Sequence, residues 1–315
     1  MSHNHEHALP SNGSVKATPF TIAIGLNMVF VVAEALWARW AGSSALLADA
    51  VHNLGDVLGL VMAMVAMILA RRAPTPIHTY GLRRTTVLAA LANAVLMLIA
   101  SAAVIWEAAE KFTHPQTVSG RVIMIVAAVG IVVNVGAAVP LLKQRASDMN
   151  TRAAVMHLLA DAAVSVGVVL SGAAVIGTGW TWIDPASSLI IAGLVAASAG
   201  KLLADALHLT LDGVPRGIDA IAVRAALESL AGVRGVHDLH IRALSTTENS
   251  LTAHLVAENG SRESLVTRAR EALLHRFALS HVTLQVESAA EACACGQPCD
   301  QQLVGKAAQA QSDVG

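Results

Sequence analysis

Two pairs of side chains in apolar parts of this sequence have the types and spacing of a metal site. His52 and Asp56 are four residues apart, and His157 and Asp161 repeat the pair in a second apolar segment. On a helix, residues four apart lie one turn apart on the same face. Two such faces that meet supply two imidazole nitrogens and two carboxylate oxygens, a set that zinc accepts in tetrahedral geometry. A donor set without sulfur also suits cobalt and nickel.

The cost of placing these carboxylates in a membrane supports the same interpretation. An aspartate at the centre of a membrane helix costs about 2.5–3.5 kcal/mol, so two of them cost roughly 5–7 kcal/mol unless something compensates. A bound cation, or protons, would compensate. Because the same pair occurs in two segments, we favour metal ligands over polar groups that only pack against each other.

The composition indicates a membrane protein. Of 315 residues, 55% are hydrophobic and 14% are charged, and the mean hydropathy is +0.58. Soluble domains carry about 25% charged residues, so we expect the lipid bilayer to be this chain's surroundings. The net charge of -1 argues against a nucleic-acid partner.

Long apolar segments predict the architecture of the first two thirds of the chain. A helix needs about 20 apolar residues to cross a bilayer. Six segments qualify: Phe20–Trp40, Leu46–Ala70, Thr85–Trp106, Val122–Leu142, Ala153–Ile176 and Pro185–Leu209. The sequence therefore predicts six transmembrane helices. At the last one, Asp184 precedes Pro185 and is expected to cap the helix that the proline begins.

Basic residues in the short loops predict the orientation. Seven of them follow the second and fourth segments: Arg71, Arg72, Arg83, Arg84, Lys143, Arg145 and Arg152. The loops on the opposite side have only Arg39, Lys111 and Arg121. Cytoplasmic loops are the ones enriched in Lys and Arg, so both termini are expected to face the cytoplasm. Residues 1–19 lack the pattern of a cleavable signal and form a predicted cytoplasmic tail with His3, His5 and His7.

The composition changes after Gly213. Helical spacing predicts helices at Ile218–Leu230 and Ser261–Ala278, and alternation predicts strands at His237–Leu244, Leu251–Ala257 and Val282–Glu287. This αββαβ order predicts a small α+β, ferredoxin-like cytoplasmic domain. The expected domains are thus the tail at 1–19, a transmembrane domain at 20–212, a metal-binding and dimerisation domain at 213–288, and a flexible Cys-containing tail at 289–315.

Three stretches of the chain resemble the cation diffusion facilitators, especially their bacterial zinc-efflux branch. They are Ser44 to Asp56 (SALLADAVHNLGD), Thr151 to Asp161 (TRAAVMHLLAD), and the Asp184-Pro185 start of the last span; Val233 to His240 (VRGVHDLH) resembles the beginning of the family's cytoplasmic domain. The resemblance implies a homodimer in the bacterial cytoplasmic (inner) membrane. It also implies export of a divalent metal from the cytoplasm in exchange for protons, by alternating access.

The resemblance also assigns residues. His52, Asp56, His157 and Asp161 match the family's transport site, and histidine at both first positions resembles members that prefer zinc. His78 matches one ligand of a loop site found in some members, although Leu82 stands where another histidine would be. In the cytoplasmic domain His237 and His254 match family ligands, while Gln285 and Glu287 stand where some members have His and Asp.

Further residues have ligand chemistry without that support. Strand geometry adds His240 and His281 to the candidates of the cytoplasmic domain. Asp49, three residues before His52, is either an entry ligand or a helix-end acid near the interface, and we favour the acid. Cys293, Cys295 and Cys299 offer soft thiolates to zinc or copper. A surface or tail role is the alternative for each of these residues.

The sequence thus predicts a divalent-cation efflux transporter, with zinc as the leading cargo and protons as the counter-ion. Metal ligation needs neutral histidine and ionised aspartate, so binding releases protons, and histidine has an ordinary pKa of about 6.5. The alternatives are an intramembrane zinc enzyme and a metal sensor that does not transport. No His-Glu-x-x-His motif is present, and we expect no enzyme. Cobalt, nickel, iron and cadmium remain open as cargo.

Overall fold

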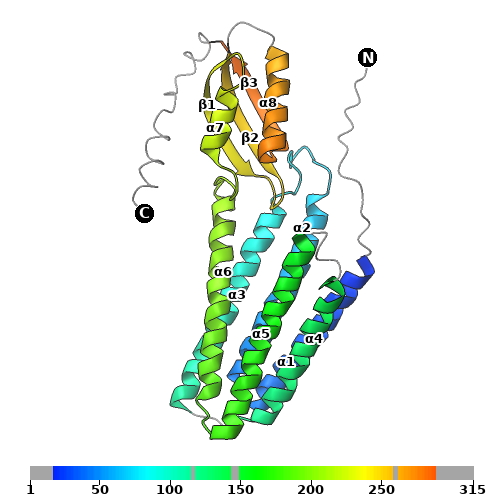
Figure 1. Cartoon of the computed structure of the whole chain (residues 1–315), viewed down its shortest axis with the longest axis vertical. Coiled ribbons are helices and arrows are strands. Elements are labelled where there is room, and N and C mark those ends of the chain that lie inside the picture. The colour runs from blue at the N-terminus through cyan, green and yellow to red at the C-terminus, as the bar shows by residue number, and fades with distance from the viewer. Residues whose placement is uncertain (1–16, 115–117, 143–148, 258–261, 289–315) are drawn as a thin grey trace. The chain divides into compact units, whose positions relative to one another are not determined.

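The computed structural model describes residues 17–114, 118–142, 149–257 and 262–288, and it leaves the side chains of residues 17–24, 26, 60, 137, 139–142 and 149–158 undescribed. Six long helices come first along the chain (Figure 1). Their bounds are α1 Ala17–Ala41, α2 Ser44–Ala70, α3 Thr85–Thr113, α4 Gly120–Leu142, α5 Met149–Thr178 and α6 Ile183–Thr210. Each apolar segment expected to be helical is therefore a helix.

Four helices in the described residues are long and apolar enough to cross a membrane. They are α2, α3, α6 and the Leu159–Thr178 part of α5. A shorter apolar stretch, Gly120–Gly136, lies in α4. The structure thus supports a helical membrane domain, while the full count of six spans remains a prediction.

The chain forms two compact units. The first contains the residues up to Leu58 together with Leu96–Ser198, and the second contains Gly59–Val95 and the residues from Ala199 onward. The core of the first unit is made of small and branched side chains, among them the fully buried Leu46, Ile123 and Val168.

Helices α4 and α5 pack with their backbones close together. A Cβ atom added at Gly120 would lie 2.7 Å from the carbonyl oxygen of Gly172, and one at Gly172 would lie 3.0 Å from that of Gly120. Small residues allow such close approach between membrane helices. This contact holds α5, which carries one of the predicted ligand pairs.

The C-terminal domain belongs to the second unit and has the predicted αββαβ order. Its elements are α7 Ala220–Glu228, β1 Val233–Ala243, β2 Asn249–Ala257, α8 Arg262–Phe277 and β3 His281–Glu287. The sheet has the order β1-β2-β3, with β1 antiparallel and β3 parallel to β2. Helix α7 packs on β1, α8 packs on β3, and the two helices contact each other (Figure 1). They enclose a core that includes Val223, Leu227, Leu251, Leu255 and Leu273.

Most boundaries shift by a few residues from prediction, and two of these shifts have a clear local reason. Helix α7 begins at Ala220 because the carboxylate of Asp219 accepts hydrogen bonds from the backbone N–H groups of Ile221 and Ala222. Strand β1 begins four residues earlier than expected. Its pairing with β2 is irregular between Val233 and Gly235, and this irregularity interrupts the alternation of the strand's first residues.

Candidate metal centres

Helices α2 and α5 bring three of the four predicted membrane ligands together. Nε2 of His52 lies 3.2 Å from Oδ1 of Asp161 and 3.9 Å from Oδ2 of Asp56. One ligand atom from each of these residues falls within 4.8 Å of the others. One imidazole nitrogen and two carboxylate oxygens form a donor set that suits zinc.

The fourth predicted ligand lies on α5, one turn before Asp161. This residue, His157, is within a helix, but its side chain lies outside the described residues. The helical spacing puts it on the same face as Asp161. Its part in the site therefore remains a prediction.

Asp49 has different neighbours. Its side chain is fully buried, and its Oδ2 accepts a hydrogen bond of 3.0 Å from Oγ of Ser165. It is not one of the three clustered ligands, so we leave it out of the ligand set. Ser165 was not among the predicted site residues, although it lies one helical turn after Asp161.

A second buried acid lies on α1. Oε2 of the fully buried Glu34 accepts a hydrogen bond of 3.1 Å from Nδ2 of Asn53.

Asp184 holds the N-terminus of α2, which corrects one sequence-based expectation. Helix α6 begins at Ile183, so Asp184 lies inside that helix and does not cap it. Its carboxylate accepts hydrogen bonds from Oγ of Ser43, from the backbone N–H of Ser44 at 2.7 Å and from that of Ala45 at 3.4 Å. The predicted capping of α6 is wrong because the Asp184 carboxylate accepts its hydrogen bonds from the start of α2 instead. The residues near Asp184 in the sequence do not indicate this distant contact.

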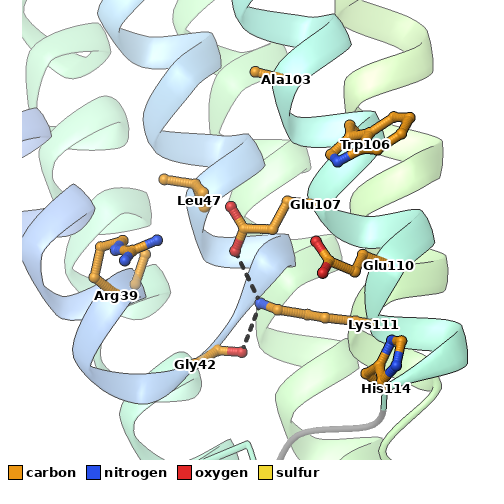
Figure 2. A pocket seen from close by; sticks show the side chains of 10 residues that line it. Arg39, Gly42, Leu47, Ala103, Trp106, Glu107, Glu110, Lys111 and His114 are labelled. Atoms are coloured by element: carbon orange, nitrogen blue, oxygen red, sulfur yellow. Dashed lines mark hydrogen bonds and ion pairs between the residues drawn. The ribbon is translucent and has the colours of Figure 1, made fainter.

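A lysine of α3 binds the turn between α1 and α2 from the α1 end. Nζ of Lys111, which is 9% exposed, donates to the carbonyl oxygen of Gly42 at 2.9 Å and lies 3.1 Å from Oε1 of Glu107 (Figure 2). These groups line a cavity of about 490 Å³ together with Arg39 and Glu110. Negative groups suit helix N-termini and positive groups suit C-termini, so the ends of α1 and α2 are both stabilised and the ligands on α2 gain a fixed start.

The C-terminal domain contains a second cluster of ligands. Oε2 of Glu287 lies 3.1 Å from Nε2 of His237, and its Oε1 lies 2.7 Å from Nδ1 of His254. His237 and His254 are paired across β1 and β2, and Glu287 is 3% exposed at the end of β3. These three residues can also hold a metal ion. Nε2 of Gln285 donates to Glu287 at 2.8 Å and orients it.

Other predicted ligands are not brought into these two clusters. His240 is exposed and lies 2.8 Å from Oδ1 of Asp238. His281 packs edge-on against the ring of Tyr80. His78 lies in an exposed turn between α2 and α3, where its backbone N–H donates to Oγ1 of Thr75. The predicted ligands Cys293, Cys295, Cys299 and the histidines of residues 1–16 lie outside the described residues.

Comparison with known proteins adds to this geometry. Residues 20–209 match the family of cation efflux transmembrane domains, and residues 215–289 match that of cation efflux protein cytoplasmic domains. A cadmium, cobalt and zinc/H(+)-K(+) antiporter of Bacillus velezensis is 33% identical over 92% of this chain and 93% of its own length. The zinc transporter ZitB of Escherichia coli is 32% identical over 91% of this chain and 93% of its own length.

The metal cation efflux system protein CzcD of Cupriavidus metallidurans is 30% identical to this chain, over 95% of the chain and 91% of the relative. The two family matches together span both the helical part and the small domain. The four strongly apolar helices agree with a transmembrane domain. The chain therefore belongs to the cation efflux (cation diffusion facilitator) family and is an integral membrane protein similar to ZitB and CzcD.

Proposed function

We propose that this protein exports a divalent cation, zinc, from the cytoplasm across the bacterial inner membrane in exchange for protons. The observation that carries the proposal is the meeting of His52, Asp56 and Asp161 from two apolar helices. The relatives support the cargo, because one is named as a zinc transporter and another as an antiporter of cadmium, cobalt and zinc.

His157 completes the transport site in this proposal. Six spans cross the membrane, both termini face the cytoplasm, and the chain works as a homodimer whose small domain has a ferredoxin-like fold. The distribution of Lys and Arg among the loops supports the orientation, and the match to the family's cytoplasmic domain supports the dimer.

The site's chemistry accounts for exchange with protons. A metal ion binds neutral imidazole and ionised carboxylate, so protons and metal compete for the same atoms. On the cytoplasmic side zinc displaces protons. When α2 and α5 move so that the site opens to the more acidic outer side, protonation weakens the ligands and the ion leaves.

The second cluster takes a zinc ion that stays with the protein. His237, His254 and Glu287 come from three strands of a domain of about 75 residues, a size at which a single core gives marginal stability. An ion shared by the three strands would stabilise the sheet. We assign this cluster a structural and regulatory role rather than a place on the transport path.

Transport into everted membrane vesicles tests the proposal against an intramembrane zinc enzyme and a sensor. Export appears as zinc uptake, because the vesicle interior corresponds to the outside of the cell. We expect uptake when the interior is acidic, its loss when nigericin collapses the gradient, and its loss in vesicles with His52→Ala. No uptake above that of vesicles without the protein would refute the transporter and leave the two rivals.

A further inference from the structure

A pair of carboxyl groups is buried beside the proposed transport site and contributes no ligand to it. Glu34 of α1 and Asp49 of α2 are both fully buried. One oxygen of each accepts from a neutral donor, Asn53 for Glu34 and Ser165 for Asp49. The remaining oxygens, Oε1 of Glu34 and Oδ1 of Asp49, meet no N–H group or hydroxyl of the described residues.

Asn53, the donor to Glu34, follows Asp49 by four residues on α2, so the two carboxyl groups face the same buried stretch of that helix. An ionised carboxylate can only accept, so a hydrogen bond between two carboxyl groups requires a proton on one of them. Two adjacent carboxylates without such a proton would repel each other, and burial makes that repulsion strong. The arrangement thus fits a pair that shares one proton.

Asp49 lies one helical turn from the nearest transport ligand on α2, and its hydrogen-bond donor lies one turn from the ligand on α5. Asp49 precedes His52 by three residues on α2, and Ser165, its donor, follows Asp161 by four residues on α5. His52 on α2 and Asp161 on α5 are the titratable side chains nearest to Asp49 and Ser165 along these two helices. On the other neighbours, Asp184 of α6 is bonded to the first turn of α2, and Arg121 is the only charged residue within α4.

We propose that Glu34 and Asp49 form a proton-binding site that exchanges its proton against the metal ion. The proposal rests on the proposed transport function. When zinc binds, the O–H bond of the pair breaks, the proton leaves to water on the open side, and both carboxylates remain. When the ion leaves, one carboxylate takes a proton from the outer side. No electron transfer is involved.

The physical cause is the charge of the cargo. Side chains one helical turn apart have Cβ atoms about 5–6 Å from each other, and a buried pair of charges is little screened by water or salt. A divalent ion therefore favours the doubly ionised pair, and the protonated pair disfavours the ion. Such reciprocal exclusion is what an antiporter requires of its two substrates.

The test measures how many protons leave the purified full-length protein for each zinc ion bound. Zinc is titrated calorimetrically in buffers of different ionisation enthalpy, and wild type is compared with Glu34→Gln and Asp49→Asn. In either variant the new amide N–H replaces the carboxyl O–H as hydrogen-bond donor, so the pair's contact is kept while its exchangeable proton is removed. Ser165→Ala is the matched control, because it removes a contact of Asp49 without removing a proton.

We expect each of the two variants to bind as many zinc ions as wild type and to release about one proton fewer for each ion at the membrane site. Ser165→Ala should release the wild-type number. An unchanged number of protons in Glu34→Gln and Asp49→Asn would overturn the proposal, and so would loss of zinc binding or of folding in both. Zinc transport by wild type in everted vesicles is measured separately, so failure of the transport function is distinguishable from failure of this inference.

Discussion

Nε2 of His52 lies 3.2 Å from Oδ1 of Asp161, although the two residues are 109 positions apart in the chain. The contact joins α2 to α5 at the level where Asp56 also approaches. Hydrogen-bond partners fix the orientation of a histidine ring, so the ligands are held near each other before an ion arrives. This relationship is the geometric basis of the proposed transport site.

Neutralising Asp161 should remove zinc from the membrane site. Asp161→Asn replaces a charged oxygen ligand by an amide, and we expect zinc affinity to fall by more than the roughly 10- to 100-fold that loss of an outer-shell partner costs. Isothermal titration of the purified protein measures it. Glu110→Gln, a carboxyl-to-amide change in the same unit but outside the clustered ligands, is the control and should bind zinc as wild type does. Equal affinities for Asp161→Asn and wild type would exclude Asp161 as a ligand.

Asp184→Asn should lower stability. The variant loses the negative charge at the start of α2 and leaves one of the donors of Ser43, Ser44 or Ala45 unsatisfied. A buried donor without a partner costs about 1–3 kcal/mol. Thermal unfolding in detergent measures the loss. Ser187→Ala, which removes a bond only within α6, should stay within about 0.5 kcal/mol of wild type; a similar loss in both variants would contradict the capping role.

The close contact of α4 and α5 predicts that adding even a methyl group at their interface lowers the stability of the protein. In Gly120→Ala the new Cβ meets the backbone oxygen of Gly172 at 2.7 Å, and a backbone atom cannot turn away as a side chain can. We expect a loss of about 1–3 kcal/mol, the usual cost of overpacking. Gly167→Ala on α5 has no atom within 4 Å of its Cβ and should be neutral or stabilising by up to about 1 kcal/mol. Equal unfolding temperatures for the two variants would contradict the close packing.

Zinc should protect the sheet of the small domain through His254. With zinc added, amide exchange in β2 of the full-length protein should slow, because an ion joining His237, His254 and Glu287 stabilises the folded strands. The protection should disappear in His254→Ala and persist in His281→Ala, whose histidine packs on Tyr80. Zinc protection of β2 that survives His254→Ala would place the ion elsewhere.

The parts of the fold that depend on local pattern were predicted from the sequence. Apolar length located the helices, and alternation located the strands; Val282, Leu284 and Val286 do share a face of β3. The helical repeat of four also brought His52 beside Asp56 on α2. These features need only nearby residues, so a single sequence contains them.

Contacts between distant elements were not predictable in the same way. Nothing near Asp184 in the sequence points to Ser43, and nothing near Asp49 points to Glu34. The paired position of His237 and His254 depends on strand register, which the irregularity at Asp238 alters. In the small domain the sequence indicated ligand types, while the tertiary fold selected Glu287 and left His240 outside.

The most direct test of the account is the simultaneous measurement of zinc and proton movement in proteoliposomes. Wild type should carry zinc toward the acidic side and protons the opposite way, with both fluxes stopping together when the pH gradient is collapsed. His52→Ala should abolish both while the protein remains folded. Zinc flux in His52→Ala equal to that of wild type, or zinc flux without proton counterflow, would contradict the account.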